Sequence, residues 1–468
     1  MKFKNLFLIP ALCFSSAYGY AQSWNIEIEN EIENGNFTRA TELIDKLPEQ
    51  IKIENQYTVD SLNLIIERIK YDFSLMPYNG YEQIRKDLPG VTSQNISDWV
   101  NKRYIESMII DGQEMWFRKA VKNLWLINPE MKQPSDPQDT ANRLDYIAKA
   151  QSMKLDKNNC SNWHHATIKY VLDVDADAVE DGTELKAWLP IPLETARQKN
   201  FKLISSSSEP TYSKESPHNT VQLIQVAKKG EKTHFEIEFS YDVAAQSYSQ
   251  EYLLKHSKPY KKQSQNYKKY TVSDGRHILV NDKMKQLAES IVKDEINPVK
   301  QASMIFNWIV SRYPWAGARD YGTIKNIPEY VLLNNHGDCG QVALLYISLT
   351  RSIGIPSRWE SGWMLHPGEL GWHDWAETYF EGIGWVPTDV SFGRNDNTTI
   401  RDYYKTGTDV YRFASNCDYG KPLSPRKKYL RSEPIDFQAG EVECAERNIE
   451  KTQFDSELII KEFIPIKY

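Results

Sequence analysis

Apolar residues recur at three- and four-residue intervals through the first third of the chain, the spacing of helices that bury one face. Two clear stripes are present, and apolar periodicity continues from Trp99 to Ile127. The pattern predicts several packed helices, which we assign to an N-terminal helical domain over residues 22–160. The apolar positions of the two stripes are Phe37, Ala40, Leu43, Ile44, Leu47, Leu62, Ile65, Ile66, Ile69 and Phe73.

The period changes from 3.6 to 2 near His164, where apolar and polar residues begin to alternate. Several such runs, separated by turn-rich stretches, are typical of a small β-sandwich, and we assign residues 161–250 to it. A polar, basic stretch follows and is interpreted as a solvated linker over residues 251–272. The alternating apolar positions are Ala166, Ile168, Tyr170, Leu172, Phe235, Ile237, Phe239 and Tyr241.

Residues 273–395 combine helical and strand patterns. Pro298 suits the first turn of a helix, and Gly354 and Pro356 would end another one. We interpret the segment as an α+β core, and residues 396–468, which end in the alternating stretch "SELIIKEFIPIKY", as a C-terminal extension that completes it. The predicted elements are helices at 284–291, 298–313 and 340–353 and strands near 357–364, 373–380 and 385–390.

The first 21 residues have the pattern of an export signal. A short basic start at Lys2 and Lys4 precedes an apolar run from Leu6 to Phe14 and then small residues. That run is too short to span a bilayer, and no later run approaches the roughly 20 apolar residues that a spanning helix needs. We therefore expect a periplasmic or extracellular protein without a membrane span. A formal net charge of −6 makes nucleic acid a poor expected partner.

The helix predicted over residues 340–353 places Cys339 at its N-terminus. Unsatisfied backbone N–H groups and the helix dipole favour an anion there, so we expect the pKa of the thiol to be lowered. Small and polar neighbours also set Cys339 apart from the apolar face of the helix. The residues alone leave three roles open for Cys339: nucleophile, buried structural thiol, and half of a disulfide.

Three further cysteines follow the predicted signal: Cys160, Cys417 and Cys444. Export to an oxidising compartment permits disulfides. Because Cys417 and Cys444 are close in sequence within a loop-rich tail, a disulfide between them is our first expectation. Cys160 and Cys339 would then remain free thiols.

A histidine and an aspartate lie on consecutive predicted strands. His373 starts the strand before the turn "EGIG", and Asp389 lies as far beyond that turn as His373 lies before it. We therefore expect the two side chains to face each other on one side of an antiparallel pair. The carboxylate would fix the imidazole tautomer and support its protonated form, as a general base that serves Cys339 requires.

Other interpretations stay open at this point. His373 could be a satisfied core histidine and Asp389 a turn residue. Zinc could take Cys339, His373 and Asp389 as ligands, but they are spread singly, without the close pairs of structural zinc sites, so we expect no metal and no cofactor. His336 and His366 are rival bases, but each lies in a predicted loop without a carboxylate on a partner strand.

The stretch "GDCGQVALLYISLTRSIGIPSRWESGW", followed by "WHDWAETYFEGIGWVPTDV", resembles the core of the transglutaminase-like superfamily. The resemblance covers about residues 275–395. It implies a papain-like fold, preceded here by an all-α region and a β-sandwich, in which a helix-borne cysteine faces a histidine and an aspartate on adjacent strands. It also implies Cys339 as nucleophile, His373 as base and Asp389 as the residue that orients the imidazole. Family members often carry an acidic residue soon after the cysteine, where this chain has Gln341.

These features predict an exported thiol enzyme that cleaves or transfers acyl groups at amide bonds through an acyl-enzyme. Peptides or proteins are the expected substrates, with cell-wall peptide as one candidate. Water is the default acceptor, so we expect a protease or amidase rather than a crosslinking enzyme. The alternative is a catalytically silent papain-like module that binds peptide or glycan. Aromatic residues near the expected cleft are candidates for substrate contact: Trp315, Tyr321, Trp363, Trp372 and Trp375.

Overall fold

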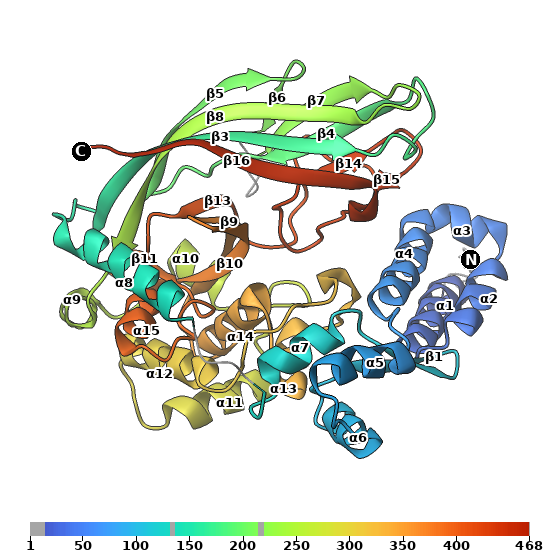
Figure 1. Ribbon diagram of the computed structural model, residues 1–468, viewed down its shortest axis with the longest axis horizontal. Coiled ribbons are helices and arrows are strands. Elements are labelled where there is room, and N and C mark those ends of the chain that lie inside the picture. Colours follow the sequence, from blue (N-terminus) through green and yellow to red (C-terminus); the bar gives the residue numbers. More distant parts are fainter. Residues whose placement is uncertain (1–14, 132–135, 214–219, 468) are drawn as a thin grey trace, which may run out of the picture. The chain divides into compact units, whose positions relative to one another are not determined.

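The structure is a computed structural model that divides into two compact units, residues 1–121 and residues 122–468 (Figure 1). The division falls within helix α7 (Ala120–Ile127), so the last part of the helical domain expected over residues 22–160 belongs to the second unit. No helix in the described part of the chain is long and apolar enough to cross a membrane. The structure describes residues 15–131, 136–213 and 220–467. The export signal is expected over residues 1–21, and residues 1–14, which contain its basic start and apolar run, lie outside these ranges.

The first unit buries the apolar stripes that the sequence predicts. Phe37, Ala40 and Ile44 of α2 are buried, as are Leu62 and Ile66 of α4, so the expected helical faces form its core. Its helices are α1 (Ser15–Glu33), α2 (Phe37–Asp45), α3 (Glu49–Glu54), α4 (Gln56–Asp72), α5 (Pro77–Asp87) and α6 (Ser93–Asn101).

The prediction of helices alone is wrong in the segment between α6 and α7, which contains a two-stranded hairpin. Strand β1 (Ser107–Ile110) pairs antiparallel with β2 (Gln113–Trp116). The turn residues Asp111 and Gly112 have positive φ angles of 47° and 82°. An Asp-Gly pair favours such a tight hairpin turn, and this local signal outweighs the apolar periodicity.

Two antiparallel sheets form a β-sandwich in the second unit, drawn at the top of Figure 1. One sheet has the order β16-β3-β8-β12, with β5 also paired to β8, and the other has the order β15-β14-β4-β7-β6. The alternating apolar residues from Ala166 to Leu172 and from Phe235 to Tyr241 are buried in a cluster that includes both sheets, as a period of two predicts. The strands are β3 (Cys160–Val174), β4 (Glu184–Pro190), β5 (Gln198–Ser206), β6 (Thr211–Ser213), β7 (Thr220–Val226), β8 (Thr233–Ser247), β12 (Gly407–Thr408), β14 (Glu441–Glu443), β15 (Asn448–Ile449) and β16 (Phe454–Pro465).

The C-terminal residues contribute strands to both the sandwich and the core. Strand β13 (Arg412–Cys417) joins the core sheet beside β9, whereas β14 and β16 join the sandwich. The predicted terminal strand is confirmed as β16, which runs antiparallel along β3 from Val174 to His164. The sandwich therefore depends on residues that follow the core in sequence.

The expected disulfide between Cys417 and Cys444 is wrong. Cys417 ends β13 in the core sheet, whereas Cys444 follows β14 in the sandwich. Proximity in sequence therefore does not bring the two sulfurs together. The described cysteines, which also include Cys160 and Cys339, are free thiols.

The stretch expected to be a solvated linker contains two short helices that pack on the core. Helix α9 (Gln250–His256) and helix α10 (Gln265–Tyr270) are each capped by a serine. The Tyr260 hydroxyl between them donates to the backbone carbonyl of Tyr379 in β10 at 2.8 Å. The polar side chains that suggested a linker therefore belong to the exposed side of these two helices.

The core is a four-stranded antiparallel sheet, in the order β11-β10-β9-β13, with helices against one face (Figure 1). Helix α14 (Cys339–Ser352) is buried along nearly its whole length. Gly354, with a φ angle of +81°, and Pro356 follow the helix end, as predicted. The other elements of the core are α11 (Asp282–Val292), α12 (Pro298–Val310), α13 (Ile327–Asn334), β9 (Ser357–His366), β10 (Glu369–Phe380), β11 (Gly384–Thr388) and α15 (Thr398–Lys405); α8 (Pro137–Ser152) precedes the sandwich in the same unit.

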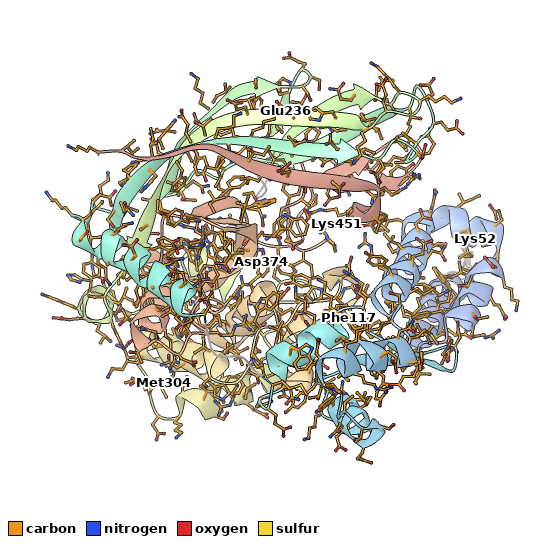
Figure 2. All side chains as sticks on the ribbon, viewed as in Figure 1. Lys52, Phe117, Glu236, Met304, Asp374 and Lys451 are labelled. Atoms are coloured by element: carbon orange, nitrogen blue, oxygen red, sulfur yellow. The ribbon has the colours of Figure 1, made fainter. Side chains whose placement is uncertain are left out.

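The core sheet is the middle layer of the second unit. Trp363 and Phe413 pack in the cluster of the sandwich, whereas Trp359 and Ala376 pack with α14. Figure 2 shows the same order, with Asp374 between the sandwich strand and the helices below. Residues at the end of α14 and on β10 are therefore held by packing from both sides.

Candidate active site

Cys339 is the first residue of α14, as predicted. The Asp338 carboxylate accepts a hydrogen bond from the backbone N–H of Gln341 at 3.0 Å, and the Gln341 side-chain oxygen accepts one from the backbone N–H of Asp338 at 3.2 Å. This reciprocal pair is a capping box. It fixes the helix end that carries the partly exposed Cys339, and it gives Gln341 a structural use.

His373 and Asp389 are in direct contact, as predicted. The Nε2 atom of His373 and Oδ2 of Asp389 are 2.6 Å apart. Strands β10 and β11 pair with Ala376 opposite Thr388. In this register His373 and Asp389 are not directly opposite each other but are offset by two residues. The contact nevertheless forms because Asp389 lies just beyond the end of β11.

The imidazole of His373 is held between two aromatic rings. Phe392 stacks on it with ring centroids 4.4 Å apart, and Trp375 stacks with centroids 5.7 Å apart. Burial lowers the pKa of His373, although Asp389 acts to raise it, so the ring rests neutral near pH 7. With Nε2 bonded to Asp389, Nδ1 is the ring nitrogen that remains for a proton from a thiol.

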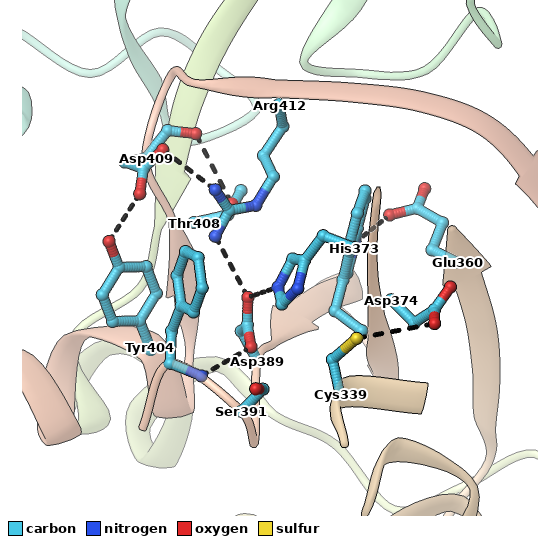
Figure 3. A network of polar contacts seen from close by, with 12 residues as sticks. Cys339, Glu360, His373, Asp374, Asp389, Ser391, Tyr404, Thr408, Asp409 and Arg412 are labelled. Carbon is cyan, nitrogen blue, oxygen red and sulfur yellow. Dashed lines mark hydrogen bonds and ion pairs between the residues drawn. The ribbon is translucent and has the colours of Figure 1, made fainter. Parts of the chain in front are cut away.

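Asp389 is also paired with a buried arginine that the sequence analysis missed. The Nη2 atom of Arg412 lies 3.0 Å from Asp389 Oδ2, and Nη1 lies 3.4 Å from Asp409 (Figure 3). Burial alone would raise the pKa of Asp389, but the charges of His373 and Arg412 lower it to about 2. Asp389 is therefore ionised throughout the physiological range. Arg412 comes from β13, and nothing local in the sequence marks it.

His366 was expected in a loop without a carboxylate partner, and this expectation is wrong. It is the last residue of β9, it is buried, and its Nε2 lies 3.0 Å from Asp409 Oδ2. The Tyr404 hydroxyl donates to the same oxygen at 2.5 Å. His366 therefore belongs to a second histidine–carboxylate pair, which Arg412 connects to the first.

The Cys339 thiol has a hydrogen-bond partner that the sequence analysis did not name. Its sulfur donates to Asp374 Oδ2 at 3.6 Å, and the other oxygen of Asp374 accepts from the Gln438 amide at 2.8 Å. Figure 3 shows the His373 ring between Asp389 and Cys339. Among the described contacts, however, the hydrogen bond of the sulfur goes to Asp374 and not to His373. The signal for Asp374 was a carboxylate directly after His373 in a strand that packs against the helix of Cys339.

The expected lowering of the thiol pKa is not what the structure gives. Burial raises the pKa of Cys339 well above its usual value, and the carboxylates of Asp374 and Asp338 raise it further. These neighbours disfavour a thiolate. The sequence shows Asp338 beside Cys339 but does not reveal that Asp374 lies against the sulfur.

The five aromatic candidates for a substrate cleft differ in position. Trp315 and Trp372 are 44% and 46% exposed. Trp363 is buried in the cluster of the sandwich, and Trp375 is buried with its indole N–H 2.5 Å from Glu360. The Tyr321 hydroxyl donates to Asp338 at 2.5 Å, so it lies beside the cysteine. The described residues contain no group of three or more histidine, cysteine or acidic side chains that could hold a metal ion.

A family model described as Transglutaminase-like superfamily matches residues 285–390, a range that contains Cys339, His373 and Asp389. The chain is also 28% identical, over 139 residues, to an uncharacterized protein of Haemophilus influenzae. That match covers 24% of this chain and 37% of the length of the relative.

Three solved structures are similar to parts of the chain. A candidate cysteine protease from Cytophaga hutchinsonii is 15% identical with a TM-score of 0.42, over 66% of this chain and 95% of that one. The periplasmic domain of TgpA from Pseudomonas aeruginosa is 12% identical with a TM-score of 0.26, over 47% and 93%. A candidate protease from Parabacteroides distasonis is 14% identical with a TM-score of 0.21, over 45% and 42%.

Proposed function

Residues 285–390 form a transglutaminase-like superfamily domain, and on this basis we propose that the protein is a cysteine enzyme that acts on amide bonds of peptides or proteins. Cys339 is the nucleophile, His373 the base, and Asp389 the residue that orients the imidazole. The observation that carries the proposal is the buried 2.6 Å contact between His373 and Asp389, in the same domain as a cysteine at a helix N-terminus.

The proposed reaction begins from a neutral thiol and a neutral imidazole, as the raised pKa of Cys339 and the lowered pKa of His373 require. The thiol proton moves to His373 Nδ1 as the sulfur attacks the amide carbonyl. The imidazolium, stabilised by Asp389, then gives that proton to the departing amine. The product of this half-reaction is a thioester between Cys339 and the acyl group.

Water is the proposed acceptor in the second half-reaction. His373 removes a proton from water as its oxygen attacks the thioester, and the proton returns to the sulfur as the carboxylic acid leaves. The protein is then a protease or amidase rather than a crosslinking enzyme. The basic and apolar N-terminal stretch supports export to the periplasm or outside the cell, where cell-wall peptide is a candidate substrate.

The test is mass spectrometry of a peptide library after incubation with the protein, with and without an added primary amine. Cleavage, deamidation and amine incorporation each produce a distinct mass change. Wild type is expected to give cleavage or deamidation that Cys339→Ala lacks. Amine incorporation in place of hydrolysis would overturn the assignment of water, and the absence of any Cys339-dependent change would overturn the enzymatic proposal for peptides.

A second candidate function is a silent groove that binds peptide or glycan. One observation favours it, because the sulfur of Cys339 bonds Asp374 rather than His373. Mass spectrometry of the intact protein after incubation with peptide separates the two functions. An enzyme is expected to carry an acyl group on Cys339 or to release cleaved peptide, whereas a silent groove binds the peptide and leaves both Cys339 and the peptide unchanged.

A further inference from the structure

Acidic side chains gather on one side of Cys339. Asp374 bonds the sulfur, and Asp338 lies next to it in sequence. Burial raises the pKa of Asp374 well above its usual value, and Asp436 and Asp338 raise it further. Burial and Glu433 likewise raise the pKa of Asp436, to about 7. Each carboxyl therefore lies within the field of the others, and a cation bound beside them would favour their ionised forms.

A primary ammonium group of the protein itself occupies this acidic region. The Nζ atom of Lys451 lies 2.9 Å from Glu433 Oε1 and 5.2 Å from the ring centroid of Trp372. The Lys451 side chain is 36% exposed. Carboxylates together with an indole face are an effective combination for a cation. We call Trp372, Glu433 and Asp436 the ammonium site.

A series of direct contacts connects the ammonium site with the sulfur. Glu433 accepts a hydrogen bond from the backbone N–H of Gln438 at 2.7 Å. The Gln438 amide donates to Asp374 at 2.8 Å, and Asp374 accepts from Cys339 at 3.6 Å. Only Gln438 and Asp374 therefore lie between Glu433 of the ammonium site and the sulfur of Cys339 in this series of contacts. Figure 2 labels both Asp374 and Lys451 within the second unit.

A buried hydroxyl beside Asp374 also lacks a partner among the described residues. Ser361 pairs directly with Asp374 across β9 and β10, so the two side chains lie on the same face of the sheet. Ser361 is fully buried, and its Oγ atom makes no hydrogen bond in the described part of the chain. The Ser361 hydroxyl therefore lies beside Asp374 and is available for a hydrogen bond.

We propose that the substrate carries a primary ammonium group next to the scissile amide, and that the ammonium site binds it in place of Lys451. This inference deepens the proposed function of Cys339 and rests on it. The chain supplies its own stand-in for the substrate group, since Lys451 already pairs with Glu433 over Trp372. A peptide with a lysine-like side chain, or with a free amino terminus beside the amide, has the required chemistry.

The first test measures how the charge of a small reagent affects its reaction with Cys339. Aminoethyl methanethiosulfonate is cationic and sulfonatoethyl methanethiosulfonate is anionic, and each forms a mixed disulfide with a thiolate and releases methanesulfinate. Rates are followed at Cys339 by peptide mass spectrometry and divided by the rates for 2-mercaptoethanol. The corrected ratio of cationic to anionic rate is expected to exceed about tenfold at low salt and to fall at high salt.

Variants connect this ratio with the ammonium site. Asp436→Asn and Trp372→Leu are expected to lower the corrected ratio of cationic to anionic rate at least about threefold. Lys451→Met is expected to raise this ratio, because the lysine that competes with the reagent is removed. Lys461→Met, on the exposed part of β16, is the matched control and leaves it unchanged. Cys417, the other partly exposed described thiol, gives an internal reference. A corrected ratio near one, or a ratio that Lys451→Met and Asp436→Asn both leave unchanged, would overturn the inference.

A second test uses peptides in pairs that differ only in charge. Peptides with lysine, acetyl-lysine or norleucine beside the amide are compared by kcat/KM for wild type and Lys451→Met. Lysine is expected to be preferred at least about tenfold, with a lower KM in Lys451→Met. Equal cleavage of all three overturns the ammonium site but leaves Cys339 as an amide-cleaving nucleophile. Reagent selectivity without any cleavage overturns the proposed function alone.

Discussion

Two carboxylates act on the candidate triad in opposite ways. Asp389 contacts His373 and stabilises its protonated form, whereas Asp374 contacts Cys339 and disfavours its thiolate. A pre-formed thiolate–imidazolium pair is therefore not the resting state. Proton transfer from sulfur to His373 requires Cys339 to leave Asp374, and a bound ammonium group that neutralises the acidic side would lower the cost of that step.

Replacement of Asp374 by asparagine is expected to lower the pKa of Cys339, because a carboxyl group that disfavours the thiolate is replaced by a neutral amide. Asparagine has nearly the same volume and can keep a hydrogen bond to Gln438. The measurement is the rate of iodoacetamide alkylation of Cys339 against pH. Asp402→Asn, on the exposed side of α15, is the control and leaves the midpoint in place. A midpoint that stays the same or rises in Asp374→Asn would contradict this account.

Asp389 predicts a specific dependence of stability on pH. Its pKa in the folded protein is about 2, below the ordinary 3.8, so the folded state binds this proton less tightly than the unfolded chain does. Its contribution to the free energy of unfolding is therefore complete above pH 4 and is lost as pH falls toward 2, in total about 2 kcal/mol. Urea unfolding at pH 5, 4 and 3 is expected to show a gap between wild type and Asp389→Asn that narrows with falling pH. A constant gap would contradict the assignment.

At the scale of elements, helix α14 and its neighbouring strands were predictable, because strong local signals define them. Gly354 and Pro356 end the helix, and the period of two marks β10. The face of β10 that receives the helix was not predictable from that period. The structure places α14 on the face of Asp374 and Thr378, where the Tyr346 hydroxyl lies 2.8 Å from the Thr378 hydroxyl. An alternating pattern defines two faces but does not say which one a helix covers.

The packing of α14 predicts a large effect for a change far from the sulfur. Leu349 is fully buried in the cluster that joins α14 to the core sheet. Leu349→Ala is expected to reduce the free energy of unfolding by about 2 to 5 kcal/mol, because it removes apolar contacts and leaves a cavity. Leu333→Ala is the matched control, since Leu333 is 57% exposed, and its effect is expected within about 0.5 kcal/mol. Urea unfolding of both variants, followed by tryptophan fluorescence, checks the difference; equal losses would mean that the burial of α14 is not what stabilises the core.

At the scale of the whole second unit, buried ion pairs join the sandwich to the core sheet. Arg197 precedes β5 and pairs with Glu360 of β9 and with Glu377 of β10. Glu360 also accepts the indole N–H of Trp375, the ring that stacks on His373. Arg197 is distant in sequence from both carboxylates, and single charged residues in separate strands give no local signal. The sequence predicts the sandwich and the core sheet, but the ion pairs that join them form only in the folded protein.

This tie predicts that a residue in the sandwich affects reactivity in the core. Arg197→Met would leave Glu360 and Glu377 as neighbouring buried carboxyls without their shared cation, at an expected cost of about 3 to 5 kcal/mol in the free energy of unfolding. Because Glu360 also anchors Trp375, the same variant is expected to lower kcat while KM changes less. Lys202→Met, at an exposed position of β5, is the control.

The double variant Arg197→Met with Glu360→Gln separates the two effects of that tie. It removes the carboxylate of Glu360, whereas Glu377 keeps its ion pair with Arg358, so the double variant is expected to regain part of the lost free energy of unfolding. The indole N–H of Trp375 can still donate to the side-chain oxygen of glutamine, so kcat is also expected to recover. Recovery of stability without recovery of kcat would instead mean that Arg197 acts on the His373 side of the core by a route other than Trp375.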